Sequence, residues 1–338
     1  MPRSAGLTSR ERVRRALRGD AVDRPPFAVW RHFYPDENEG AERLAGTTIA
    51  FTTRHRLDIV KYNPRAHYHA EPWGTAYRYA GAARPTLVRY AVRRPDDWRK
   101  IGRKPVSAPA FRELLDGLRR VRVALPDVPL LATIFTPLGV LERLGGKERL
   151  LADLRARPDA VLAALDAVAE TFAALARACV ETADGIFLAT TSWAQRDTLD
   201  QGEYARFGRP FDLRVLAGAR GAALNVLHVC GPNARVVELA RYDVTAVSWN
   251  PRLAGNPNLA AFQGATADRG AIGGLSDAAL LARSPAAARR EIAEGLAQTR
   301  GRRWLAAGGC TIPPESRPEA IDAARDALAS RDQIKTSP

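Results

Sequence analysis

Short apolar runs alternate with longer segments of helical pattern along most of this chain. Alternation of this kind favours a parallel sheet covered by helices, and eight strand–helix units are typical of a closed (β/α)8 barrel. The runs predict eight strands, at 25–30, 58–63, 129–135, 184–190, 223–230, 244–249, 271–275 and 303–309. Helical patterns predict helices at 8–19, 158–182, 201–218, 233–241, 285–299 and 318–330. The fold class expected is α/β, with a single TIM barrel.

One segment breaks the alternation. Residues 68–92 contain YHAEPWGTAYRYAG and PTLVRYAV, which predict a hairpin inserted after the second strand. No internal repeat and no low-complexity segment interrupts the rest. We therefore expect one domain over 1–338, with its core at 20–330 and a loose tail, RDQIKTSP, at the end.

The net charge of +14 raises the question of nucleic-acid binding. Only five of the 51 basic residues are lysines, and the arginines are interspersed with acidic residues, as in ERVRRALRGDAVDR. No basic run alternates with aromatic residues, and no zinc-finger, RNP or helix-turn-helix pattern is present. We therefore expect no nucleic-acid partner.

The sequence also bears on location. The N-terminal stretch MPRSAGLTSRERVRRAL is polar, unlike a secretory signal, and the apolar segment 161–180 is interrupted by Asp166, Glu170 and Arg177. Three cysteines make no disulfide framework. These features predict a cytoplasmic protein that does not span a membrane, and they leave the oligomeric state open.

Metal-ligating residues follow two of the predicted strands. His228 and Cys230 are two positions apart in LNVLHVCGPN, so both side chains point to the same side of an extended chain. Cys310 follows the last strand in AAGGCTIPPE. In a (β/α)8 barrel functional residues come from the carboxyl ends of the strands, so the three can meet at the barrel mouth.

One imidazole and two thiolates suit Zn²⁺ better than Mg²⁺ or Ca²⁺, and three protein ligands leave one tetrahedral position open, as in catalytic zinc sites. Ordinary burial is the alternative for each residue taken alone, since cysteine often serves as a small buried apolar residue. Cys179, on an alanine-rich helix face, is expected to play that structural role. Spacing alone leaves metal binding and burial both open.

The chain resembles the uroporphyrinogen decarboxylase superfamily over most of its length. The opening RERVRRALRGDAVDRPPFAVW and the third-strand segment LATIFTPLGVLERLGG are similar to the family's own, and GIFLATTSWAQ, LHVCG and GCTIPPESRPEAIDA match later blocks in the same order. The resemblance implies a (β/α)8 barrel, in agreement with the strand count.

Two branches of the superfamily compete. The decarboxylases carry a second arginine after strand one, a catalytic Asp in F-S-D-I after strand two and a His in a final G-H-G. This chain keeps Arg31 but continues with HFYP, has KYNPRAHY in place of F-S-D-I, and has Cys310 where the His would stand. Porphyrinogen decarboxylation is therefore the alternative function, and non-catalytic binding of a tetrapyrrole or corrinoid is a third.

The chain is more similar to the corrinoid-linked methyltransferases, including the methylcobalamin:coenzyme M enzymes. Their H-x-C motif and late Cys correspond to His228, Cys230 and Cys310. The resemblance implies that these residues bind catalytic zinc, that a small thiol occupies the open position, and that its thiolate takes a methyl group from free methylcobalamin or a corrinoid protein. The candidate substrate-binding residues, each at or just after a predicted strand end, are Arg31, His32, Asn63, Trp193 and Asn250.

Overall fold

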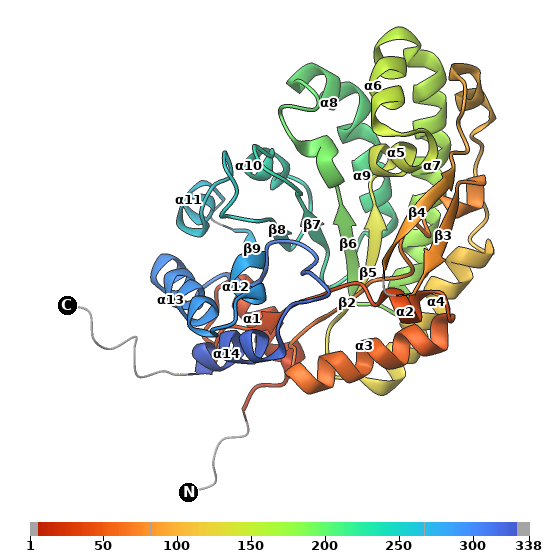
Figure 1. Ribbon diagram of the computed structural model, residues 1–338. Helices are drawn as coiled ribbons and strands as arrows, with labels where there is room; N and C mark the ends of the chain where they lie inside the picture. Colours follow the sequence, from red (N-terminus) through yellow and green to blue (C-terminus); the bar gives the residue numbers. More distant parts are fainter. Residues whose placement is uncertain (1–5, 82, 267, 330–338) are drawn as a thin grey trace, which may run out of the picture.

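A computed structural model describes residues 6–81, 83–266 and 268–329 of the chain. Eight parallel strands form a nearly closed barrel, in the order β1-β10-β9-β8-β7-β6-β5-β2, with helices on the outside (Figure 1). The predicted α/β class and TIM barrel are confirmed. The strands are β1 Phe27–Ala28, β2 Val60–Tyr62, β5 Leu130–Phe135, β6 Gly185–Ala189, β7 Val226–His228, β8 Ala246–Ser248, β9 Gly270–Leu275 and β10 Trp304–Gly308.

Each of these strands lies inside or within one residue of a predicted run. The strands are buried on both faces, by the barrel interior on one side and by helices on the other. Every residue of β6 and β10, for example, is buried. Parallel strands of this kind appear in a sequence as continuous apolar runs, which explains why the runs located them.

The barrel meets itself between β1 and β2, the two ends of the strand order. The Asp58 N–H donates to the Phe27 carbonyl at 2.9 Å, and the Phe27 N–H donates to Asp58 Oδ2 at 2.9 Å. Arg12 and Arg24 both form ion pairs with the same carboxylate at 2.7 Å. Asp58 is only 1% exposed. One buried carboxylate therefore joins both edge strands and two guanidinium groups.

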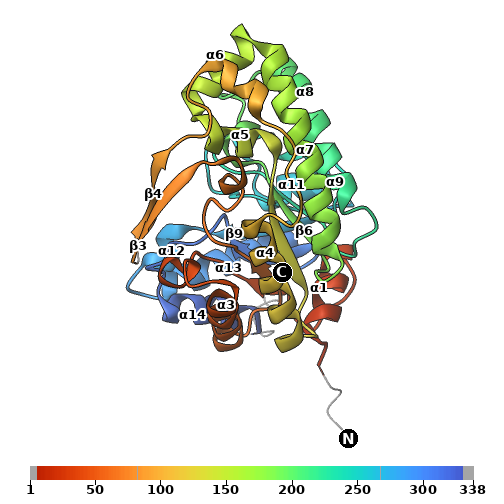
Figure 2. The same ribbon diagram turned by 90° about the vertical axis from the view of Figure 1, so that its right-hand side faces the viewer.

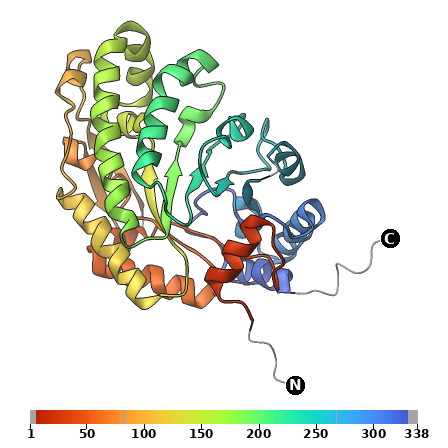
Figure 3. The same ribbon diagram turned by 180° about the vertical axis from the view of Figure 1, so that it is seen from behind.

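The first helix closes the lower end of the barrel. It is α1, Ser9–Arg18, and Figure 3 shows it in red across that end. Thr8 and Glu11 form the capping box, and the helix ends at Gly19 in the left-handed conformation with φ 86°. Val13 and Leu17 pack into the apolar barrel interior from below. The opposite end, at the carboxyl ends of the strands, is left open for a site.

The remaining helices surround the barrel. They are α2 Tyr34–Glu37, α3 Ala41–His55, α4 Pro109–Ala124, α5 Pro137–Gly145, α6 Lys147–Ala156, α7 Pro158–Val180, α8 Gln201–Phe207, α9 Arg209–Gly218, α10 Val236–Leu239, α11 Leu259–Ala265, α12 Asp277–Leu281, α13 Ala286–Thr299 and α14 Pro318–Ala329. Short 3-10 turns are η1 Glu71–Trp73, η2 Pro95–Lys100 and η3 Thr191–Ala194.

Two predicted helices need correction. The segment predicted as one helix over 201–218 is divided at Gly208 into α8 and α9. Pro210, which has no N–H to donate to the preceding turn, lies in the first turn of α9, so the apolar pattern continues while the helix does not. The helix predicted over 233–241 is confined to the four residues of α10.

The predicted hairpin after the second strand is confirmed. Strands β3, Ala76–Ala80, and β4, Ala83–Arg89, pair antiparallel and stand at the side of the barrel (Figure 2). Most of β4 is exposed. The hairpin nevertheless contacts the residues that follow β2, because the Tyr77 ring stacks on His67 at 3.9 Å between centroids. Across the described residues, no helix has the length and apolar character needed to cross a membrane.

Closure of the barrel at Asp58 can be tested by Asp58→Asn. The amide removes the charge that pairs with the buried Arg12 and the half-buried Arg24, so we expect the free energy of unfolding to fall by about 3–5 kcal/mol. Urea unfolding followed by circular dichroism measures the change. Asp127→Asn, at an exposed position, is the matched control and should alter stability by less than about 0.5 kcal/mol. Equal stability of the two variants would contradict this account of the seam.

Candidate metal centre

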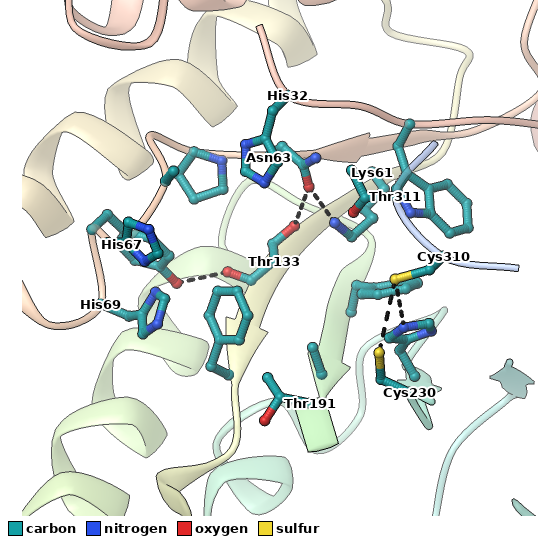
Figure 4. A pocket seen from close by; sticks show the side chains of 18 of the residues that line it. His32, Lys61, Asn63, His67, His69, Thr133, Thr191, Cys230, Cys310 and Thr311 are labelled. Carbon is teal, nitrogen blue, oxygen red and sulfur yellow. Dashed lines mark hydrogen bonds between the residues drawn. The ribbon is translucent and has the colours of Figure 1, made fainter. Parts of the chain in front are cut away.

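Three metal-ligating side chains meet at the carboxyl ends of β7 and β10. His228 is the last residue of β7, and Cys230 follows two positions later. Cys310 stands two positions after β10. His228 Nε2 lies 3.3 Å from Cys310 Sγ, and the two sulfur atoms lie 4.0 Å apart (Figure 4). All three donor atoms are within 4.8 Å of one another.

These separations fit tetrahedral zinc. Bonds of about 2.3 Å to sulfur and about 2.1 Å to nitrogen place tetrahedral ligands roughly 3.8 Å apart for two sulfurs and roughly 3.6 Å apart for sulfur and nitrogen. The S–S and N–S separations of 4.0 and 3.3 Å are close to both values. The donor set of one imidazole and two thiols is also one that zinc accepts. The three residues can therefore hold this metal with one position left free.

The orientation of His228 is fixed by its neighbours. Its Nδ1 lies 3.2 Å from the hydroxyl of Ser248, a fully buried residue at the end of β8. The Phe187 ring, from β6, stacks on the imidazole at 5.2 Å between centroids. Both contacts leave Nε2 directed at the cysteines. Metal-binding histidines use their second nitrogen in this way, and the contact tunes metal affinity.

A glycine allows the chain to turn directly after Cys230. Gly231 has φ 88°, in the left-handed region that other residues rarely adopt. A Cβ atom there would lie 1.9 Å from Gln195 Nε2. The glycine in the sequence LHVCG is thus favoured by its backbone conformation, and a larger residue would also require the flexible Gln195 side chain to move.

The two thiols differ in acidity. The hydrogen bond between the Cys230 and Cys310 sulfurs, with the contact from His228, holds the pKa of Cys310 well below its usual value. The same hydrogen bond and burial raise the pKa of Cys230. These opposite shifts favour the thiolate, the form that binds metal, at Cys310 rather than at Cys230.

The cluster opens onto a cavity of about 520 Å³ at the barrel mouth. Figure 4 shows Cys230 and Cys310 on one wall, with His67 and His69 on the other. The His69 ring stacks on Phe135 at 4.0 Å between centroids. Aromatic and histidine side chains contribute to these walls, and burial lowers the pKa of His67 to about 3. The imidazoles of this wall are therefore uncharged at neutral pH.

Two of the predicted substrate-binding residues, His32 and Asn63, line this cavity. His32 Nδ1 contacts the buried Glu37 carboxylate at 2.6 Å. Asn63 stands just after β2 and donates from Nδ2 to the Arg31 carbonyl at 3.1 Å. Their predicted contact with substrate stays a prediction.

The other three predicted substrate-binding residues are not among the side chains that line the cavity. Arg31 donates to the Pro314 carbonyl at 2.7 Å. Trp193 is fully buried and donates to Glu142 at 2.8 Å. Asn250 accepts from the backbone N–H two positions further on. The sequence placed these residues near strand ends but did not show which way the side chains point.

Several residues that line the cavity are not predicted by the sequence patterns, among them Lys61, His67, His69 and Thr191. A compositional signal was available, because four of the five histidines of the chain line this one cavity. Lys61 is also one of only five lysines, and it lies within a predicted buried strand. A charged residue in such a strand has to face something polar.

The fold and the site together define a TIM barrel with a histidine–cysteine cluster at its mouth that could hold a metal ion. The sequence model of the uroporphyrinogen decarboxylase (URO-D) family matches residues 8–330, so the chain belongs to this family. A comparison with curated protein sequences gave no match.

Solved structures with the same fold include a methyltransferase from Methanosarcina mazei, with TM-score 0.79 and 18% identity over 95% of this chain and 98% of that one. A B12-independent methionine synthase from Shewanella sp. W3-18-1 has TM-score 0.62 and 11% identity, over 90% of this chain and 95% of its own. A putative vitamin-B12 independent methionine synthase from Listeria monocytogenes has TM-score 0.55 and 12% identity, over 92% and 95%. At these identities the likeness establishes the fold alone.

Metal analysis tests the cluster. We expect about one zinc per chain in the purified protein, since three protein ligands suffice for a catalytic site. Cys230→Ala and Cys310→Ala should each lose most of it on dialysis. Cys179→Ala, which removes the buried thiol on α7, is the matched control and should keep it. Full zinc occupancy in the double variant Cys230→Ala/Cys310→Ala would overturn the site.

Proposed function

We propose that this chain is a zinc-dependent methyltransferase that transfers a methyl group from a methylated corrinoid to a small thiol. The observation that carries the proposal is the His228–Cys230–Cys310 cluster, whose three donor atoms lie within 4.8 Å of one another and face a cavity. Methyl-transfer proteins among the structures with the same fold support it.

The residues of the cavity have separate tasks in this reaction. His228, Cys230 and Cys310 hold the metal, and Ser248 keeps the imidazole in place. Zinc bound there supplies a Lewis acid that lowers the pKa of a coordinated thiol, and so favours its nucleophilic form. Aromatic side chains of the cavity, such as Phe135 and Phe187, would shield the nucleophile from water, and the open mouth would admit the corrinoid from the carboxyl-end face of the barrel.

The chain lacks the groups needed for the alternative, decarboxylation of uroporphyrinogen. Where the decarboxylases carry a catalytic aspartate after strand two, this chain has the neutral amide of Asn63 as the first residue beyond β2. Cys310, in place of their final histidine, is part of the metal cluster. A neutral amide does not stabilise a cationic pyrrole as a carboxylate does.

The methyl donor would be free methylcobalamin or a corrinoid protein, since either can present a methyl–cobalt bond at the open mouth.

The state of the cysteines fits a reducing environment. The three cysteines are free, and the Cys230 and Cys310 sulfurs lie 4.0 Å apart, well beyond the length of a disulfide bond. Free thiols at a working site fit the reducing cytoplasm, where we place the protein.

The number of protons released on thiol binding tests the proposal. A thiol that enters the cluster as the thiolate should release about one proton near pH 7, since a free thiol is largely protonated there. Calorimetry in buffers of different ionisation enthalpy gives the proton count, and absorbance follows loss of the methyl group from methylcobalamin. His228→Ala should reduce both signals together.

A panel of thiols is needed, because one unsuitable acceptor decides nothing. Absence of proton release together with an unchanged methylcobalamin spectrum across the whole panel would contradict the methyltransferase proposal.

Uroporphyrinogen tests the alternative function. We expect no coproporphyrinogen above the enzyme-free rate, because Asn63 and Cys310 stand where the decarboxylases carry an aspartate and a histidine. Chromatography of the oxidised porphyrins measures the product. Robust turnover that persists after zinc removal would favour the decarboxylase instead.

A further inference from the structure

A buried lysine lies on the floor of the cavity. Lys61, in the middle of β2, is 7% exposed and lines the cavity (Figure 4). Its Nζ lies 4.7 Å from the centroid of the Phe187 ring and 5.8 Å from that of Trp30. It donates one hydrogen bond, to Asn63 Oδ1.

No carboxylate of the described residues forms an ion pair with this ammonium group. An ammonium has three N–H donors, so two remain for a group inside the cavity. Burial lowers the pKa of Lys61 to about 7, while the negative charge of Cys310 opposes the shift. A buried cation without a counter-ion is costly, and an anion bound beside it offsets the cost.

The other cations around the cavity are already paired or exposed. Arg65 forms ion pairs with Glu71 at 2.9 Å and with Glu113 at 3.3 Å. Arg143 pairs with Glu142 at 3.1 Å. Arg84 stands on the exposed strand β4. Among the described lining residues, the buried cation left for a ligand is therefore Lys61.

Lys61 is also placed next to the metal cluster. The Phe187 ring contacts both the Lys61 ammonium and the His228 imidazole. A small molecule can therefore reach the cluster with one end and the ammonium with the other. Neighbouring polar groups hold the floor in place: the Thr133 hydroxyl donates to the Tyr62 carbonyl at 2.7 Å.

We propose that Lys61 determines acceptor specificity by binding an acid group of the thiol substrate, and that Asn63 positions the Lys61 ammonium for this contact. The substrate class is then a short thiol that carries a carboxylate or another acid group. The identity of the acceptor rests on the proposed function, whereas the binding of an acid group by Lys61 can be tested without it.

Matched ligands test the subsite on the zinc-containing protein. Calorimetry compares 3-mercaptopropionate with 3-mercaptopropanamide, which differ in charge but hardly in shape. We expect the acid to bind at least about tenfold more tightly, as for a hydrogen bond to a charged group in a dry site. Lys61→Met should abolish the preference and leave the dissociation constant of the amide unchanged, and Lys61→Arg should restore part of the preference.

Controls separate folding from binding. Methionine in place of a buried, unpaired lysine is expected to preserve stability, which thermal unfolding checks, and Lys61→Gln gives a second variant. Lys104→Met, at a lysine that does not line the cavity, should keep the preference for the acid. Equal affinity of acid and amide in the wild-type protein, or a preference that survives in both Lys61→Met and Lys61→Gln, would overturn the proposal.

Ligands without a thiol show whether the Lys61 subsite or the proposed methyl transfer is wrong. Ligand-observed NMR compares propionate with propanamide on the wild-type and Lys61→Met proteins. A preference for propionate that depends on Lys61, without binding of any thiol at the metal, supports the subsite and contradicts thiol methyl transfer. Thiol binding with proton release, but without preference for acids, supports methyl transfer and contradicts the subsite.

Discussion

The parallel direction of all eight strands is the constraint on which the site depends. Because every strand ends at the same rim, residues far apart in sequence are brought together there, and Cys230 and Cys310 come within 4.0 Å. That arrangement requires the barrel to meet itself between its first two strands. Asp58 makes this contact with its backbone and its side chain, at the opposite end from the metal cluster. Stability and chemistry are thus divided between the two ends of one barrel.

Charge balance determines what the cavity can bind. Two thiolates and a bound divalent metal would compensate each other. The wall of His67 and His69 is neutral at physiological pH, since burial lowers the pKa of both imidazoles. Lys61 is the buried amine of this lining, and burial lowers its pKa to about 7, so an acid bound beside it would favour its charged form. In the proposed reaction, a neutral cluster would activate a thiol without attracting anions in general, and the lysine would supply the selectivity. Phe187 contacts both parts of the cavity, since its ring packs against the His228 imidazole and the Lys61 amino group.

Much of the fold was predictable from the sequence, because strands buried on both faces appear as unbroken apolar runs. The approach of His228, Cys230 and Cys310 was also expected from their places at strand ends, and the distances agree with it. The direction of single side chains was not predictable. Trp193 follows a strand as expected but is buried against Glu142, since local turns after a strand decide orientation. Lys61 was overlooked because its strand was identified by its apolar neighbours.

X-ray absorption at the zinc edge tests the central claim most directly, because it counts the sulfur atoms around the metal. The account predicts two sulfurs and one imidazole nitrogen from the protein, with a lighter atom at the fourth position, and three sulfurs after a thiol substrate is added. Coordination by oxygen and nitrogen alone, or a sulfur count that does not change at saturating thiol, would contradict it.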